Sequence, residues 1–269
     1  MTDLVAMEDV GDGVVVITMD DQARYNAVSM SMVSALKEAF ALAEPTRGWR
    51  AAVLTGAGRG FCGGGDMTFR PDPAPDTDGR SEIGRLIRSQ GHLAELILAI
   101  RELRKPVVAA VHGGAIGGGL GLALACDIRL AAPSATFSAR FIRIGITGCD
   151  VGTTYLLPRI VGAGRAAELV LTGRDIDAEE AERIGLVSRV VGEREVVGAA
   201  IGTAKVLAAH TELGVELTKA GLWANVDAPS LRHAVEHENR TQVLSLLAGQ
   251  MAEGGKAILE RRPPVWKPM

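Results

Sequence analysis

The stretch GGAIGGGLGLALACD, from Gly113 to Asp127, decides how this 269-residue chain can fold. The segment before it, RKPVVAAVHGG, predicts a strand that starts after Pro106 and stops at Gly113. After the glycines the residues become almost wholly apolar, which is typical of a buried helix. A helix that opens in a glycine cluster presents free amide N–H groups and the positive end of its dipole. The stretch therefore predicts a strand, a turn that a ligand can approach closely, and a helix in direct succession.

A second glycine cluster follows another predicted strand. It reads LTGAGRGFCGGGD, from Leu54 to Asp66, and no helix is expected after it. Glycine lets the backbone adopt positive φ and approach a ligand, so each loop could offer one N–H to the same oxygen. Such a pair of donors is an oxyanion hole. Tight packing of small residues would explain either cluster alone, but two clusters at this spacing favour the oxyanion hole.

Strands and helices alternate over the first part of the chain, which favours an α/β layered core. One helix is expected over Ser29–Glu44, with Ser29 or Ser31 as its N-cap. Another follows Asp177, which can act as a cap with Glu180 three residues later. Strands are expected over Val14–Asp20, Arg50–Gly56, the residues after Pro106, Cys126–Pro133 and Gly185–Val191.

From about Glu193 the segments are helical, with no strand signal between them. We therefore divide the chain into a core, residues 1–192, and a helical C-terminal extension, residues 193–269. Exposed alone, this extension would show broad apolar faces, so it should pack on the core or on another subunit.

Composition narrows the function classes. The net charge is -3, so neither nucleic acid nor an anionic membrane is indicated as a partner. The N-terminus lacks a signal-peptide pattern, and no apolar run reaches the roughly 18 residues of a membrane span. Cys62, Cys126 and Cys149 are scattered and odd in number, which fits a reducing cytoplasm better than a disulfide framework.

Three other motifs have simpler interpretations. The GxGxxG match from Gly58 to Gly63 follows a strand, but no helix opens after it, so a dinucleotide site is not expected. The HxxEH pattern of His233, Glu236 and His237 lacks a third ligand and fits a charged helix face, so no metal is expected. His112 ends a strand and is expected to be structural rather than catalytic.

Five segments, spread over most of the chain, share features with one family. They are MDDQARYNAVS, AAVLTGAGRGFCGGGDM, KPVVAAVHGGAIGGGLGLALACDIRLA, ELVLTGRDIDAEEAERIGLVSRVV and AILERRPPVW. The chain thereby resembles the crotonase superfamily, the enoyl-CoA hydratase/isomerase family. The resemblance implies a spiral of ββα turns with a helical C-terminal trimerisation region, commonly assembled as a dimer of trimers. It also implies an acyl-CoA thioester as substrate, an enolate as intermediate, and no cofactor beyond the coenzyme A of the substrate.

The same resemblance assigns site residues. It places the two oxyanion amides on Gly65 and Gly118, in agreement with the glycine pattern. Coenzyme A's phosphates and adenine are expected to meet Arg24 and its loop, with Arg261 or Arg262 from a neighbouring subunit. Further substrate-binding positions are expected at Ala23, Gly63, Asp66, Gly121 and Phe141.

The sequence departs from the family pattern at two catalytic positions. Hydratases of this family use two glutamates to activate water, and here those positions hold Gly121 and Phe141, which cannot move a proton. One carboxylate remains nearby, Asp150 in the segment GITGCDVGTT, a loop in which related isomerases carry an active-site acid. It could act first as base and then as acid. Alternatively, it caps the helix that begins near Gly152.

Three functions stay open. The first is isomerase-like proton transfer on an enoyl-CoA, with Asp150 as the catalyst. The second is hydration by a non-standard acid and base set. The third is a non-catalytic acyl-CoA binding or carrier protein. The loop Arg70–Glu82, expected to be mobile, and the helix after it should shape the acyl pocket, but the acyl group itself is not specified.

Overall fold

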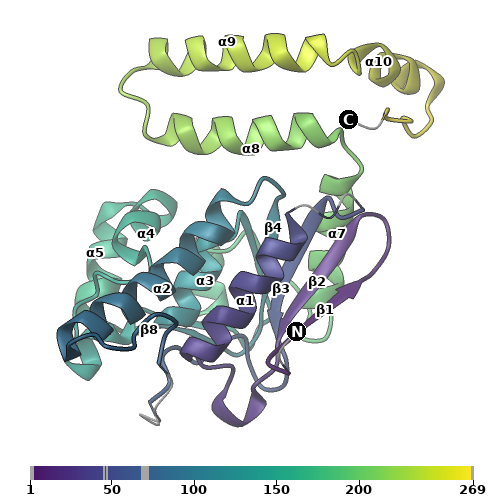
Figure 1. Cartoon of the computed structure of the whole chain (residues 1–269). Helices are drawn as coiled ribbons and strands as arrows, with labels where there is room; N and C mark the ends of the chain where they lie inside the picture. Colours follow the sequence, from purple (N-terminus) through teal and green to yellow (C-terminus); the bar gives the residue numbers. More distant parts are fainter. Residues whose placement is uncertain (1–2, 45, 47, 68–72, 268–269) are drawn as a thin grey trace.

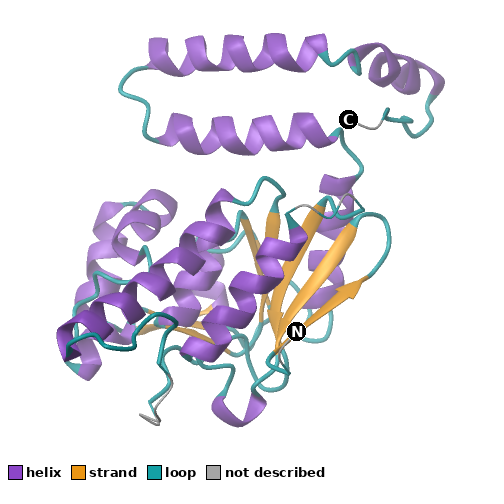
Figure 2. Cartoon of the chain, viewed as in Figure 1, coloured by secondary structure: helices purple, strands orange, loops and turns teal. Residues whose placement is uncertain are grey.

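A six-stranded sheet forms the centre of the molecule (Figure 2), in the order β1-β2-β3-β4-β6-β9. The computed structural model describes residues 3–44, 46, 48–67 and 73–267. Strand β1 pairs antiparallel with β2, and every other neighbouring pair is parallel. The bounds are β1 Val5–Asp9, β2 Val14–Met19, β3 Ala51–Gly56, β4 Val107–Val111, β6 Ile128–Ala131 and β9 Arg189–Val190.

Helices cover both faces of this sheet (Figure 1). Val15 and Ile17 of β2 pack in the apolar cluster formed with α1, α2 and α3, whereas Val14 and Val16 pack against α7. Both faces of the central strands are thus buried, which is why β3 and β4 are continuous runs of apolar or small residues. The helices are α1 Met30–Ala43, α2 Glu82–Glu102, α3 Gly118–Ala125 and α7 Val196–Ala208.

The five expected strands are present, as β2, β3, β4, β6 and β9, although β9 is only two residues long. The sequence analysis missed β1 at the sheet edge. It also missed a second, three-stranded sheet in the order β5-β7-β8, formed by Gly114–Ile116, Thr136–Ser138 and Asp175–Asp177. Strands of three residues are too short to show an alternating pattern.

Two helix starts follow the expected capping chemistry. The Ser29 side chain accepts a hydrogen bond from the Met32 N–H at 3.1 Å, so Ser29 rather than Ser31 caps α1. The Asp177 carboxylate accepts from the Glu180 N–H at 2.8 Å and caps α6, Ala178–Arg183. The remaining elements before α7 are η1 Gln22–Arg24, η2 Arg140–Ile144, α4 Thr153–Val161 and α5 Ala163–Thr172. Of the loop expected over residues 70–82, residues 70–72 lie outside the described residues.

The chain after residue 193 divides into two parts. Helix α7 packs on the sheet, because Val196, Ala200, Ala204 and Ala208 recur every four residues and form one small apolar stripe. The part that projects from the core starts at α8, and we call it the C-terminal arm, while the domain division at residue 193 stays a prediction. It consists of α8 Glu212–Val226, α9 Leu231–Leu247 and α10 Met251–Glu260 (Figure 1).

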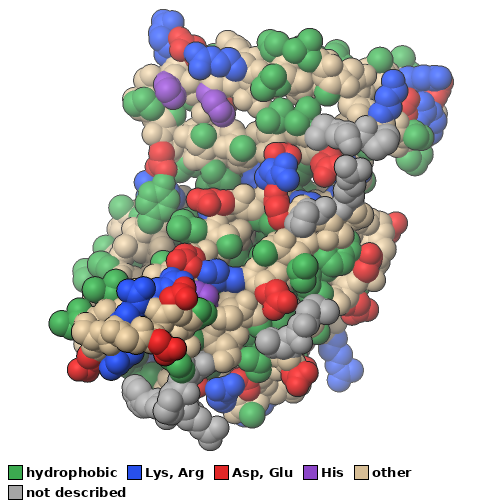
Figure 3. Space-filling view, viewed as in Figure 1, with side chains coloured by type: hydrophobic (Ala, Val, Ile, Leu, Met, Phe, Trp, Pro, Cys, Tyr) green, Lys and Arg blue, Asp and Glu red, His purple; other side chains and the backbone are tan. Residues whose placement is uncertain are grey.

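The C-terminal arm exposes apolar side chains. No described residue of α8 or α9 is buried. Apolar atoms are visible along these helices in the space-filling view (Figure 3). None of the described helices is both long and apolar enough to cross a membrane. The exposed large apolar residues of the arm include Leu222, Leu231, Val243, Leu244, Leu247, Met251, Ile258 and Leu259.

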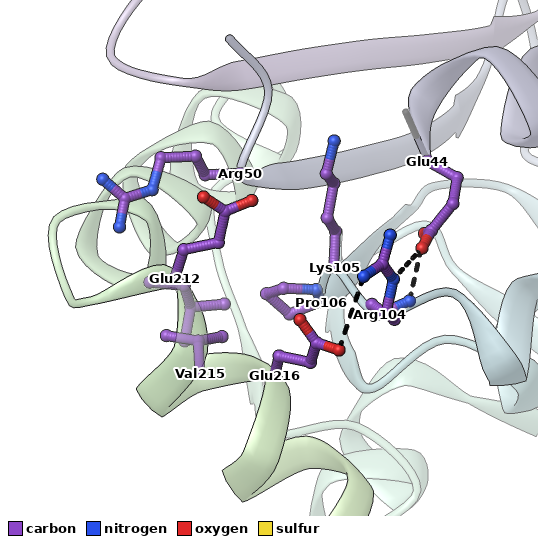
Figure 4. Close-up of a pocket in the computed structure, with 9 residues that line it drawn as sticks. Glu44, Arg50, Arg104, Lys105, Pro106, Glu212, Val215 and Glu216 are labelled. Atoms are coloured by element: carbon purple, nitrogen blue, oxygen red, sulfur yellow. Dashed lines mark hydrogen bonds and ion pairs between the residues drawn. The ribbon is translucent and has the colours of Figure 1, made fainter. Parts of the chain in front are cut away.

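Polar groups join the arm to the core. At the base of α8, Arg104 pairs with Glu44 of the core and lies 3.7 Å from the Glu216 carboxylate (Figure 4). The buried Lys105 ammonium donates to the carbonyl oxygens of Ala43 and Thr46, at 2.6 and 2.7 Å. The small pocket between these groups contains none of the site residues expected from the sequence.

Asp127 is the main anchor of α8. Its Oδ1 accepts from the Trp223 indole N–H at 3.1 Å, and its Oδ2 pairs with the Lys219 ammonium at 2.8 Å. The Arg101 guanidinium stacks on the Trp223 ring, 3.0 Å from its centroid. Burial lowers the pKa of Lys219, and the neighbouring Asp127 partly opposes this shift. The Asp127 carboxylate therefore favours the charged form of Lys219.

Replacing Asp127 by alanine should destabilise the protein. The change leaves the largely desolvated Lys219 ammonium with the Lys105 carbonyl, at 3.0 Å, but without its carboxylate, and breaking such a charge pair typically costs about 3–5 kcal/mol. We expect a loss of that size in the free energy of unfolding, measured by urea denaturation. Arg183→Ala removes an exposed ion pair with Glu180 and should cost only about 0–1 kcal/mol. Equal effects of the two changes would contradict the anchoring role of Asp127.

Candidate active site

The two glycine loops lie side by side. The Cys62 N–H donates to the Gly114 carbonyl at 2.8 Å, and the Ile116 N–H donates to the Cys62 carbonyl at 3.0 Å. On the other side of the first loop, the Val28 N–H donates to the Gly64 carbonyl at 2.7 Å. Backbone hydrogen bonds thus fix the first loop between two other segments, as in a short piece of sheet.

Asn26 ties the segment around η1 to the first loop. Its side-chain amide donates to the carbonyl oxygens of Ala57 and Gly60, each at 2.9 Å, and its Oδ1 accepts from the Asp21 N–H at 2.8 Å. The residue is fully buried and has a φ of 53°, a left-handed conformation in which asparagine is enriched. The sequence analysis gave Asn26 no role of its own, although it lies in one of the family segments.

Two glycines permit the close approach of the loops. A β-carbon on Gly119 would lie 2.3 Å from the Cys62 carbonyl oxygen. A β-carbon on Gly64, whose φ is 95°, would lie 2.7 Å from the Ile116 carbonyl oxygen. Both distances are far below van der Waals contact, so only glycine fits at these positions.

The Gly65 and Gly118 amides are neighbours in this arrangement. Gly118 is the first residue of α3, and a β-carbon on it would lie 3.9 Å from the Gly64 carbonyl carbon, to which the Gly65 nitrogen is bonded. Within the described part of the chain, no group accepts a hydrogen bond from either N–H. Nothing lies within 4 Å of a β-carbon built on Gly65. Open space therefore borders Gly65, while Gly118 packs against Val28, whose Cγ2 would lie 3.1 Å from a β-carbon on Gly118, and the Gly118 N–H sits at the positive end of a helix dipole.

Arg24 lies next to the first loop. Its guanidinium contacts the Asp66 carboxylate at 3.1 Å and the Asp21 carboxylate at 2.5 Å. The hydrogen bond to Asp21, followed by the contacts with Asp66, raises the pKa of Arg24 against the opposing effect of desolvation. Ala23 is exposed in η1, and the Gly63 N–H donates to the Tyr25 carbonyl at 2.8 Å. The expected substrate-binding residues near Arg24 thus gather at one place.

Asp150 is not a side-chain cap. The N-cap of α4 is Gly152 and makes no side-chain hydrogen bond, while the Asp150 backbone carbonyl accepts from the Thr153 N–H at 2.8 Å. The Asp150 Oδ1 accepts from the Val151 N–H at 2.8 Å and from the side-chain amide of Gln90 in α2. No contact is recorded for Oδ2 among the residues that the structure describes. The capping alternative for this side chain is therefore wrong, and one carboxylate oxygen stays available.

Apolar groups fill the two positions at which the resemblance places the hydratase glutamates. A β-carbon on Gly121 would lie 2.4 Å from Val151 Cγ2, so Val151 covers this glycine. The Phe141 ring packs against Gly117, where a β-carbon would lie 3.5 Å from Cε1. Phe141 and Val151 are 6% and 4% exposed. This wall beside the N-terminus of α3 is therefore apolar.

Val151 holds an uncommon backbone conformation. Its φ is 44°, a region that β-branched residues almost never occupy. Such a residue costs on the order of 1–3 kcal/mol. Burial of its side chain offsets this by about 1.5–3 kcal/mol. The sequence analysis assigned no role to Val151 or Gln90, and the only local signal was the adjacent Gly152, whose φ is 72°.

The remaining candidates lie elsewhere. His233, Glu236 and His237 are in α9, and no group of three or more His, Cys, Asp or Glu side chains able to hold a metal occurs among the described residues. Arg262 donates to the Glu253 carboxylate at 2.6 Å, and Arg261 follows α10. Both arginines belong to the C-terminal arm, in another part of the chain from the glycine loops.

An apolar groove of about 640 Å³ lies on the outer side of the segment that carries Asp150. Gly148 and Cys149 border it from this segment, and α4 and α5 form its other sides. Gln90 shows that α2 reaches the same segment from the opposite direction. Helix α2 therefore contacts the segment that carries Asp150, while its expected role in shaping the acyl pocket stays a prediction.

The glycine loops allow a direct test of their packing. Gly119→Ala places a methyl group against the Cys62 carbonyl, so the backbone must shift, and we expect a loss of about 1–3 kcal/mol in the free energy of unfolding. Gly198→Ala in α7 meets nothing within 4 Å and should stabilise the protein by about 0.5–1 kcal/mol. Urea denaturation of both variants measures the difference. A neutral Gly119→Ala would show that the loops are farther apart.

Comparisons with known proteins agree with this geometry. The family model for enoyl-CoA hydratase/isomerase matches residues 9–268. The probable enoyl-CoA hydratase echA12 of Mycobacterium leprae is 40% identical over 98% of this chain and 90% of the relative. The 1,2-epoxyphenylacetyl-CoA isomerase of Escherichia coli is 33% identical over 96% of each chain.

A solved structure extends the agreement to the fold. The probable enoyl-CoA hydratase/isomerase from Mycobacterium abscessus superposes with a TM-score of 0.92 at 37% identity, covering 98% of this chain and 99% of that one. The α/β fold with its central sheet is therefore the one that the resemblance implied. This chain belongs to the enoyl-CoA hydratase/isomerase family of the crotonase superfamily, and it is an enzyme of that family acting on acyl-CoA thioesters.

Proposed function

We propose that the enzyme moves a proton between two carbons of an enoyl-CoA thioester, with Asp150 as base and then acid. The observation that carries this proposal is the combination of two unoccupied amides with a single available carboxylate oxygen. The Gly65 and Gly118 N–H groups would hold the thioester oxygen. Each such donor typically contributes about 3–4 kcal/mol to transition-state stabilisation.

The reaction needs one proton-transfer group. With a 3-enoyl thioester, the Asp150 carboxylate takes a proton from C2, and the electron pair of that C–H bond moves toward the carbonyl oxygen to form a dienolate. The protonated Asp150 returns the proton to C4 as the double bond shifts to C2–C3. No atom is gained or lost, so the same carboxyl group serves both steps.

Hydration fits the site less well. Adding water requires a group that activates the water and a group that protonates the neighbouring carbon. Gly121 and Phe141 supply neither, which favours isomerisation over a non-standard hydratase. A non-catalytic acyl-CoA binder or carrier, which the sequence left open, would use the same two amides, but the relatives that this chain matches are named as enzymes.

We further propose that coenzyme A binds along Arg24, Ala23 and Asp66, which lie together beside the Gly65 amide. The exposed apolar faces of α8 to α10 support assembly as a trimer or a dimer of trimers, in which Arg261 or Arg262 could reach a neighbour's coenzyme A. The unpaired cysteines fit a cytoplasmic location. No cofactor beyond coenzyme A is proposed.

Asp150→Asn tests the isomerase proposal. Asparagine keeps the shape but cannot take a proton, so we expect deuterium entry at C2 and C4 of a 3-enoyl-CoA in heavy water to fall by roughly 100- to 10,000-fold. NMR of the recovered thioester measures it. Asp12→Asn, at an exposed turn, is the matched control and should exchange normally. Exchange that survives Asp150→Asn would place the base elsewhere, and tight binding without exchange in the unaltered protein would favour the carrier.

Arg24→Gln tests the coenzyme A site. Loss of a charge-assisted contact to phosphate should raise KM for a coenzyme A thioester about 10-fold. KM for the corresponding pantetheine thioester, which lacks the nucleotide phosphates, should stay unchanged. Steady-state kinetics with the two substrates provides the comparison. An equal rise for both would mean that Arg24 only supports the loop through Asp21 and Asp66.

A further inference from the structure

The geometry points to Val151 as the residue that restricts this site to proton transfer. Its side chain occupies the place beside Gly121 that a water-activating side chain and its water would need. This inference rests on the proposed function and adds the residue that determines reaction specificity.

The position of Val151 relative to the amides gives it this role. Gly121 lies on the same face of α3 as Gly118, less than one turn further along the helix. The Val151 Cγ2 and Cβ atoms lie 2.4 and 2.6 Å from the place that a β-carbon of residue 121 would take. A side chain at position 121 and the valine side chain therefore exclude each other.

The surroundings of Val151 offer few polar partners to a reacting water molecule. A buried water needs two to four polar partners. The Gly121 N–H already donates to the Gly117 carbonyl at 3.1 Å, and the Phe141 ring covers Gly117. The Val151 carbonyl oxygen lies 3.0 Å from the place of a β-carbon on Gly121, but it can only accept a hydrogen bond. Of the side chains described on this wall, Asp150 alone can exchange a proton, whereas hydration needs an acid and a base.

Val151 and Asp150 form one structural unit. The Val151 N–H donates to the Asp150 Oδ1, and the Asp150 carbonyl accepts from the Thr153 N–H. The left-handed backbone at Val151 and Gly152 turns the chain into α4. The turn that directs the Asp150 carboxylate to Gln90 also directs the valine side chain onto Gly121. The catalyst and the barrier to water are thus set by the same backbone geometry.

The experiment restores a carboxylate at position 121 with and without the valine. Gly121→Glu alone should add no water to a 2-enoyl-CoA, because the side chain cannot enter its place. Gly121→Glu combined with Val151→Gly should add water on the order of 100-fold faster than Gly121→Glu alone. Glycine adopts the φ of residue 151 without strain. Product formation is followed by the mass gain of one water and the loss of the conjugated enoyl absorbance.

A matched control uses the other side of the same segment. A β-carbon on Gly148 would meet Val170 Cγ1 at 2.5 Å, in the apolar groove rather than beside α3. The control variant Gly148→Glu with Val170→Ala likewise introduces a glutamate and shrinks the valine that it would meet. It should add no water to the 2-enoyl-CoA. Gly121→Asp with Val151→Gly carries a shorter acid and serves if the glutamate variant does not fold, as judged by circular dichroism.

Two results would overturn the inference. One is equal hydration by Gly121→Glu with and without Val151→Gly. The other is a folded double variant that binds the thioester and hydrates it no faster than the unaltered protein. Deuterium exchange by the unaltered protein is a separate measurement, so hydration gained by the double variant would support the role of Val151 even if the proposed isomerisation failed.

Discussion

The close approach of the second glycine loop to the first is the constraint on which the site depends. Because the Cys62 carbonyl lies where a β-carbon of residue 119 would be, the two loops meet backbone to backbone. This contact leaves the Gly65 and Gly118 amides as neighbours, with open space beside Gly65. In the function that we propose, the bare backbone of these loops is itself the functional group. Side chains contribute mainly by holding it in place, as the buried Asn26 does.

The sequence was informative where local chemistry and periodicity agree. Apolar runs ended by glycine predicted the central parallel strands, and Ser29 and Asp177 predicted their helix starts. The glycine pattern also predicted that the two loops would meet, and the resemblance placed the paired amides on Gly65 and Gly118, although their catalytic role stays a prediction.

The rest depends on contacts between distant segments. Nothing local shows that Gln90 reaches Asp150 across 60 residues of chain. Strand β5 is three residues inside a glycine cluster and pairs with β7, so its sequence carries no strand pattern. The left-handed conformation of Val151 could not be predicted from the sequence for another reason. Gly152 signals a left-handed turn, but a β-branched neighbour in the same conformation contradicts its intrinsic preference, and only the packing on Gly121 explains it.

The attachment of the C-terminal arm has a consequence for association. Asp127 holds α8 through Lys219 and Trp223, so these contacts orient the arm within a single chain. The conformational entropy of these helices is therefore already lost when the single chain folds. A second molecule that covers the apolar faces then meets a rigid surface and loses little further conformational freedom on binding. Buried charge at the base of the arm thus makes its apolar outer face a preorganised one.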